Sequence, residues 1–188
     1  MKKNWFWFFS LFIVIVFFGA GCPNFFSQNN KSNMTPYDEQ EEMFVYKDPT
    51  YKFVLEYPSG IEIKPRPSEF HKTDYLGIPV DFFLSIRDYR QGTEAPENIF
   101  YVYSADSNLT TDTFINALIA SDPSSISILN QELIEQGKLT ITKIVSTTAS
   151  GVEKRHYLFS INQSVIIFSE FLHQQEVADV LIASMQLD

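Results

Sequence analysis

Segments in which apolar and polar residues alternate follow one another along most of this chain of 188 residues. Such alternation is typical of strands that pack one face on a core. The clearest case is Tyr51 to Tyr57, which Pro58-Ser59-Gly60 ends. The sequence predicts strands at residues 44–46, 51–57, 61–63, 82–87, 99–103, 139–147, 155–161 and 165–172, and favours a strand-like or irregular segment at 126–135.

Two segments have a helical pattern instead. The first follows Thr110 and carries apolar residues at 114, 115, 118 and 119, and Ser121-Asp122-Pro123 ends it. The second runs from His173 to Ala183. Strands that follow one another without alternating helices indicate an antiparallel β-sheet with helices packed on it, an α+β fold.

The beginning of the chain has a different character. Lys2 and Lys3 precede an apolar run from Trp5 to Phe18, and Gly19-Ala20-Gly21-Cys22 follows. This order is typical of a secretory signal peptide. The last four residues resemble the lipobox of bacterial lipoproteins, although Gly19 stands where that family has an aliphatic residue.

The lipobox resemblance implies that the sulfur of Cys22 carries a diacylglycerol and that the leader is cut before it. The expected division is residues 1–21 as signal peptide, 22–43 as flexible tether and 44–188 as one domain. The alternative is an uncleaved single-span anchor, for which Trp5 to Gly21 is at the short limit. Either anchor places the domain outside the cytoplasm, at the cell membrane or the outer membrane.

Composition limits the partners. Cys22 is the only cysteine, so the exported domain has no disulfide and no thiolate metal site. The net charge is −9, which disfavours nucleic acid and anionic lipid headgroups as partners. The expected membrane contact is therefore the lipid at Cys22.

The segment from Tyr51 to Gly60 is similar to the opening of PsbP-like and Mog1-like domains. In those families a Phe-x-Tyr-Pro-x-x-Trp stretch begins the sheet, and Ile61 takes the tryptophan position here. The resemblance covers about residues 44–188. It implies an α/β/α sandwich and a binding or assembly role, and it transfers no catalytic residue.

The residues that carry chemistry form no recognisable catalytic, cofactor-binding or metal-binding motif. We expect His71 to be solvated in a loop and His156 to lie on the exposed face of a strand. His173 and Glu176 have a spacing that can bind metal on one helix, but an ordinary helix start is favoured. Asp88, which has Arg87 and Arg90 as neighbours, is expected to form a surface ion pair.

Aromatic residues give the remaining hypothesis. Tyr75, Tyr89 and Tyr101 lie in or beside predicted strands, where core packing is the simpler interpretation. The alternative is that they border a groove that recognises a partner, since amphipathic rings suit such surfaces. The favoured function is a non-enzymatic binding or assembly module. The other hypothesis is an extracytoplasmic hydrolase with a pocket near Asp88 to Glu97.

Overall fold

The computed structural model describes residues 42–90, 97–171 and 175–188. Most of these residues belong to strands, as the alternating sequence patterns predict. The elements are β1 (Met43–Lys47), β2 (Phe53–Pro58), β3 (Ile61–Pro65), η1 (Ser68–Phe70), β4 (Lys72–Tyr75), β5 (Ile78–Asp88), β6 (Glu97–Asp106), α1 (Thr111–Ser121), β7 (Ser127–Gln136), β8 (Leu139–Thr147), β9 (Glu153–Ile161), β10 (Ser164–Glu170), α2 (Gln175–Ala183) and β11 (Gln186–Leu187).

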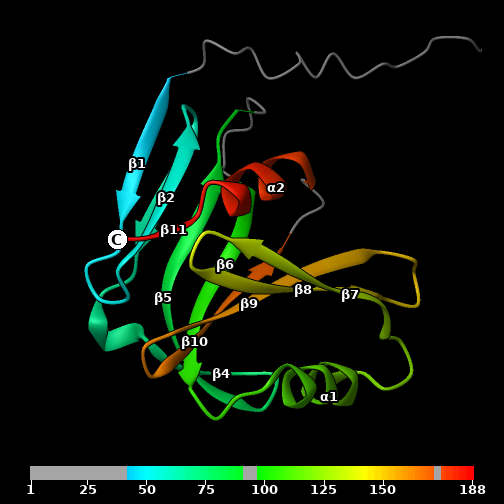
Figure 1. Cartoon of the computed structure of the whole chain (residues 1–188). Helices are drawn as coiled ribbons and strands as arrows, with labels where there is room; N and C mark the ends of the chain where they lie inside the picture. Colours follow the sequence, from blue (N-terminus) through cyan, green and yellow to red (C-terminus); the bar gives the residue numbers. More distant parts are fainter. Residues whose placement is uncertain (1–41, 91–96, 172–174) are drawn as a thin grey trace, which may run out of the picture. The chain divides into compact units, whose positions relative to one another are not determined.

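Two antiparallel sheets form the framework (Figure 1). The larger has eight strands in the order β3-β5-β6-β10-β9-β8-β7, with β4 paired to β5. The smaller has the order β1-β2-β11, so the last strand of the chain pairs with the second. The predicted α+β class with antiparallel strands is therefore confirmed.

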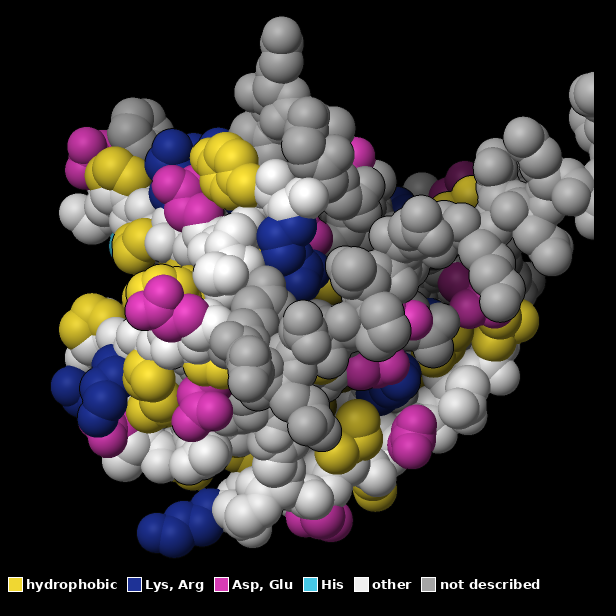
Figure 2. All heavy atoms as spheres, turned by 90° about the horizontal axis from the view of Figure 1, so that it is seen from above, with side chains coloured by type: hydrophobic (Ala, Val, Ile, Leu, Met, Phe, Trp, Pro, Cys, Tyr) yellow, Lys and Arg dark blue, Asp and Glu magenta, His cyan; other side chains and the backbone are white. Residues whose placement is uncertain are grey.

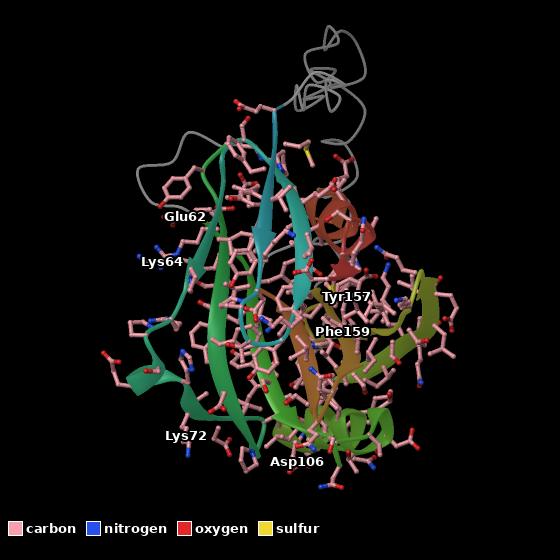
Figure 3. All side chains as sticks on the ribbon, turned by 60° about the vertical axis from the view of Figure 1, so that its left-hand side comes forward. Glu62, Lys64, Lys72, Asp106, Tyr157 and Phe159 are labelled. Carbon is pink, nitrogen blue, oxygen red and sulfur yellow. The ribbon has the colours of Figure 1, made fainter. Side chains whose placement is uncertain are left out.

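One face of the large sheet packs against the small sheet and α2, and we call it the α2 face. Phe53 of β2 lies at its centre and contacts the rings of Phe83, Phe159 and Phe168. Ile61, at the tryptophan position of the PsbP-like motif, is buried in the same cluster. Figure 3 shows Tyr157 and Phe159 of β9 in this interior, whereas Glu62 and Lys64 project from β3 at the edge.

The opposite face carries α1, and we call it the α1 face. Phe114 and Leu118 of the helix pack on Ile144, Leu158 and Ile167 of the sheet. The helix begins as the sequence predicts, because the Thr110 side chain accepts a hydrogen bond from the Thr113 N–H, and the Thr113 side chain accepts one from the Thr110 N–H. The sheet therefore has two hydrophobic clusters, one on each face.

The hairpin of β4 and β5 was not expected, since residues 69–72 read as a loop. Its two-residue turn is Leu76-Gly77, and both residues have positive φ, 58° and 75°. That combination is the type I′ turn, which matches the twist of paired strands. Two other bounds also differ from expectation: β5 already begins at Ile78 and β6 at Glu97.

The remaining predicted segments are close to their expected places. Residues 127–136 form a full strand, β7, where the sequence left a choice. The hairpin turn at Asn162-Gln163 joins β9 to β10 as predicted. His173, the predicted signal peptide and residues 22–41 of the predicted tether lie outside the described residues. Met43, the last residue of the predicted tether, is the first residue of β1.

Acidic, basic and hydrophobic side chains are interspersed on the described surface seen from above in Figure 2. The net charge of −9 is therefore not gathered into one patch on that face. Within the part of the chain that the structure describes, no helix combines the length and apolar character needed to cross a bilayer.

Candidate partner-binding surface

A row of aromatic rings crosses the α1 face beside α1. Tyr75 of β4 stacks on Tyr103 of β6 with ring centroids 4.5 Å apart. Phe82 of β5 contacts both Tyr103 and Tyr101, at 5.3 and 5.4 Å. Tyr101 in turn contacts Phe171, which follows β10, at 5.3 Å. We call these five residues the aromatic row.

Strand geometry explains the row. Residues two apart on one strand share a face, so Tyr101 and Tyr103 lie side by side on β6. β5 is the direct neighbour of β6 and brings Phe82 opposite Tyr103. β10 pairs with the other edge of β6, with Glu170 opposite Phe100, and this places Phe171 near Tyr101.

The row is most buried at Tyr103 and most exposed at Phe171. Tyr103 is 8% exposed, Tyr101 and Phe82 are half-buried, and Phe171 is 51% exposed. The guanidinium of the exposed Arg66 lies 4.6 Å from the centre of the Phe82 ring, a cation–π contact. The exposed end thus combines large apolar area with one positive charge, which is typical of sites that bind protein partners.

The structure brings two of the three predicted tyrosines into this row. Tyr75, which is half-buried, lies at one end beside Tyr103, and Tyr101 lies beside Phe171 at the other. The third, Tyr89, directly follows β5 and is 42% exposed. Its hydroxyl donates a hydrogen bond to the Glu62 carboxylate at 3.2 Å. The sequence analysis did not identify Phe82, Phe171 or Arg66 as part of this surface. Phe82 could have been found, because Val80 and Phe82 are two residues apart and so lie on the same face of a strand.

A buried polar network anchors the inner end of the row. The Tyr75 hydroxyl lies 2.6 Å from the Ser169 hydroxyl, which lies 3.1 Å from Nδ1 of His156. Burial raises the pKa of Tyr75. The network links β4, β10 and β9 and thereby fixes where the row begins.

The expectation that His156 is exposed was wrong. It is 1% exposed, and its ring lies edge-on to Phe114 of α1 at 5.4 Å. Burial, with a smaller contribution from Lys154, lowers its pKa to about 3. The imidazole is therefore neutral at physiological pH, because the surrounding apolar side chains would leave a charged ring without solvation.

The contact between Ser169 and His156 has the distance of a nucleophile and its base. However, Ser169 is only 6% exposed, and its hydroxyl also bonds to the Tyr75 hydroxyl. A serine this buried, with its hydroxyl already bonded to Tyr75, is not presented to solvent, so the geometry favours a structural role for the pair.

Asp88 was expected in a surface ion pair and is instead 2% exposed. Its carboxylate accepts hydrogen bonds from Nε and Nη2 of Arg90, both at 3.0 Å, and from the Arg90 backbone N–H at 2.9 Å. A fork of this kind satisfies both carboxylate oxygens and so makes burial of the charge tolerable. The pair fixes the end of β5.

The other ionisable candidates are also placed. His71 is half-buried rather than solvated, with Nε2 2.6 Å from the Arg66 carbonyl oxygen. Asp179 of α2 pairs with Lys143 at 3.5 Å. Among residues 42–90, 97–171 and 175–188, no three His, Cys, Asp or Glu side chains gather in an arrangement that could hold a metal ion.

The pocket expected near Asp88 to Glu97 includes residues 91–96, which lie outside the described part. The structure does show two cavities elsewhere, of about 370 and 430 Å³. The smaller lies on the α1 face between the start of α1 and strands β8 to β10, and the larger is formed by residues of β4, β5, β6 and the β9–β10 turn.

Comparison with known proteins supports the fold. No protein-family model matches the sequence, and no curated protein is significantly similar to it. The solution structure of cyanobacterial PsbP (CyanoP) from Synechocystis sp. PCC 6803 is similar, with a TM-score of 0.50 and 10% sequence identity. The similarity covers 79% of this chain and 94% of that one. The described domain therefore has a PsbP-like α+β fold.

Proposed function

We propose that this chain is a lipid-anchored extracytoplasmic protein whose PsbP-like domain binds a protein partner and is not itself an enzyme. Two lines support the anchor: the apolar leader of residues 5–18 and the small residues directly before Cys22. The thioether-linked diacylglycerol, together with acylation of the new amino terminus, would give the two chains that stable anchoring needs.

The observation that carries the binding role is the aromatic row. Its outer half presents Phe82, Tyr101 and Phe171 to solvent beside Arg66. Aromatic residues and arginine are enriched where proteins meet, because aromatic rings bury much area at a low entropic cost and arginine offers several hydrogen-bond donors on a planar group. The buried network at Tyr75 holds the inner rings in place, so a partner would meet a surface that is already formed.

Two of the ionisable groups that the structure buries, Asp88 and His156, support a non-catalytic role. Asp88 is neutralised by Arg90, and His156 is neutral and packed against Phe114. Each is bound to a neighbouring side chain rather than aimed into a cavity. These arrangements stabilise the fold.

Metabolic labelling with an alkyne fatty acid tests the anchor. We expect the wild-type protein to incorporate the probe and to partition into membranes, and Cys22→Ala to do neither. A wild-type protein that remains unlabelled in cells whose other lipoproteins are labelled would reject lipidation. The partner-binding role would be untouched by that result.

Site-specific photo-crosslinking tests the binding role. A photoreactive amino acid at position 101 or 171 should yield the same crosslinked protein from intact membranes, and position 133, 64% exposed on β7, should not. Phe82→Ala should reduce the yield from both positions at least tenfold. Equal yields from all three positions, or yields indifferent to Phe82→Ala, would refute the proposed surface.

A further inference from the structure

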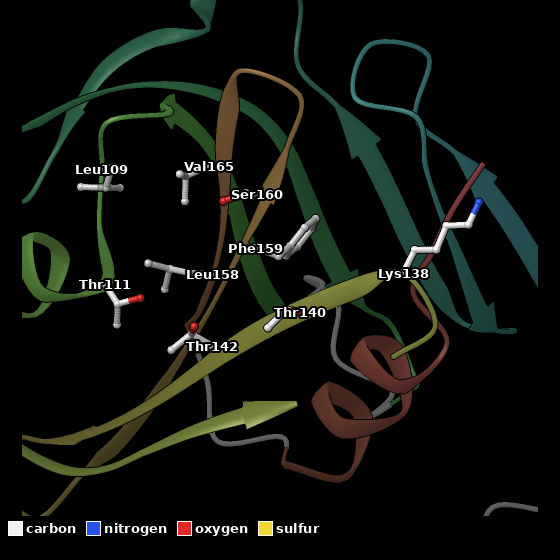
Figure 4. Close-up of a pocket in the computed structure, with 9 residues that line it drawn as sticks. All are labelled: Leu109, Thr111, Lys138, Thr140, Thr142, Leu158, Phe159, Ser160 and Val165. Atoms are coloured by element: carbon white, nitrogen blue, oxygen red, sulfur yellow. The ribbon is translucent and has the colours of Figure 1, made fainter. Parts of the chain in front are cut away.

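The cavity of about 370 Å³ on the α1 face has an unusual lining for a surface hollow. Four hydroxyl side chains border it, from Thr111 at the start of α1, Thr140 and Thr142 on β8, and Ser160 on β9. Its apolar lining comes from Leu109, Leu158, Phe159 and Val165. Figure 4 shows the Thr111 and Thr142 side chains on either side of Leu158.

Thr142 is the most informative of these residues. It is 9% exposed and lines the cavity, and its hydroxyl keeps access to solvent there. The hydroxyl is therefore free to donate to, or accept from, a molecule that enters the cavity.

The charges around the cavity disfavour an anion. Lys138 borders it, but Figure 4 shows its side chain extending away from the hydroxyl groups. The carboxylate of Glu135 accepts a hydrogen bond from the Thr140 hydroxyl at 3.0 Å, and Asp112 lies in the first turn of α1. A phosphate or carboxylate would therefore meet the carboxylate of Glu135 beside Thr140, with the Lys138 ammonium group turned away.

We propose that this cavity binds a neutral saccharide. Hydroxyl side chains both donate and accept hydrogen bonds, as the hydroxyl groups of a sugar require. Leu109, Leu158 and Val165 can contact the C–H face of a pyranose ring. The volume falls in the range of ligand sites, about 300 to 1,000 Å³. This site is separate from the aromatic row and does not depend on the proposed protein partner.

The test uses the full-length protein in a detergent without a sugar headgroup. Binding of cellotetraose, maltotetraose and chitotetraose is measured by titration calorimetry and by saturation-transfer NMR. We expect at least one to bind in a 1:1 ratio. Thr142→Val and Ser160→Ala should each weaken that binding about 3- to 10-fold, the effect of one lost neutral hydrogen bond.

Thr73→Val, which removes an exposed hydroxyl from β4, is the matched control and should leave the affinity unchanged. Ser160 is exposed, so Ser160→Ala reports on the cavity even where Thr142→Val lowers stability. The proposal fails when none of the three tetrasaccharides binds at millimolar concentration. It also fails when both cavity variants bind like the wild type, or when inorganic phosphate displaces the sugar.

Discussion

The hydroxyl of Ser169 and Nδ1 of His156 lie 3.1 Å apart across the β9–β10 pair, and both side chains are almost fully buried. The position of His156 opposite Ser169 in the register makes this contact possible. The contact joins a titratable group to the hydroxyl network that ends at Tyr75, and it gives the domain a pH-dependent stability.

His156 has a pKa of about 3 in the folded domain and of about 6.5 when unfolded. As the pH falls below about 6.5, the unfolded chain takes up a proton that the folded domain refuses. The contribution of buried, neutral His156 to stability is therefore complete above the pKa of the unfolded chain. It is lost as the pH falls from that value toward the pKa of the folded domain. We expect the free energy of unfolding to fall by up to about 1.4 kcal/mol per pH unit in this window.

Urea unfolding at several pH values between 7.5 and 4.5, with His156→Leu as the reference, measures this contribution. Carboxylates titrate in both proteins and cancel in the difference, so the wild type should lose stability relative to the variant as the pH falls. Parallel pH profiles for the two proteins would show that His156 is not buried as the structure has it.

Gly60 lies at the turn between β2 and β3 with a φ of +80°, and a Cβ there would overlap Cγ of Arg90. Gly60→Ala should destabilise the domain more than Gly151→Ala, where φ is +77° and the space is open. The left-handed backbone alone costs about 1 to 2 kcal/mol for a non-glycine residue. Thermal unfolding of both variants gives the comparison.

The overlap with the Arg90 side chain should account for the additional stability that Gly60→Ala loses relative to Gly151→Ala. In an Arg90→Ala background the cost of Gly60→Ala should fall to that of Gly151→Ala, since the overlapping side chain is gone. A double-mutant cycle that shows no coupling between positions 60 and 90 would contradict the packing described here.

Asp48, 5% exposed, organises the turn between β1 and β2. Its carboxylate accepts hydrogen bonds from the Tyr46 hydroxyl at 3.0 Å and from the N–H groups of Thr50 and Tyr51 at 2.9 and 2.6 Å. Asp48→Ala should cost about 1 to 3 kcal/mol, because buried donors lose their acceptor. Asp74→Ala, which removes one bond to the Gly77 N–H in an exposed turn, should cost less in the same urea titration.

Two neighbouring positions on α1 test its packing. Leu118 is 4% exposed and Ile119 36% exposed. Leu118→Ala should destabilise the domain by about 2 to 5 kcal/mol through lost burial and a residual cavity, and Ile119→Ala by less than about 1 kcal/mol. Calorimetric unfolding of the two variants checks this; a larger loss for Ile119→Ala would mean that the helix is rotated.

The strands that pack one face on a core could be predicted from the sequence. Successive side chains of a strand point to opposite faces, so apolar and polar residues alternate in such a strand. Tyr51 to Tyr57 shows this alternation clearly, and its strand is found at Phe53–Pro58. β4 escaped prediction since its turn, Leu76-Gly77, lacks the asparagine or aspartate that usually marks a two-residue hairpin.

The site could be predicted only in part. Tyr75 and Tyr101 were identified by residue type, but their joining through Tyr103 and Phe82 depends on which strands are neighbours. His156 was expected on an exposed face because it lies next to Arg155 and Tyr157 in a predicted strand. Its surroundings come from Phe114, which is distant in sequence and approaches only when α1 packs on the sheet.

The pairing of β11 with β2 brings the last residues of the chain against one of the first strands. Lys47 and Asp188, 141 positions apart, form an ion pair at 3.3 Å, and the Asp188 N–H donates to the Lys52 carbonyl. Without residues 186–188, that side of β2 would have no strand beside it. A chain truncated before β11 would therefore expose unpaired backbone N–H and C=O groups along β2, and such an open edge is a template for aggregation.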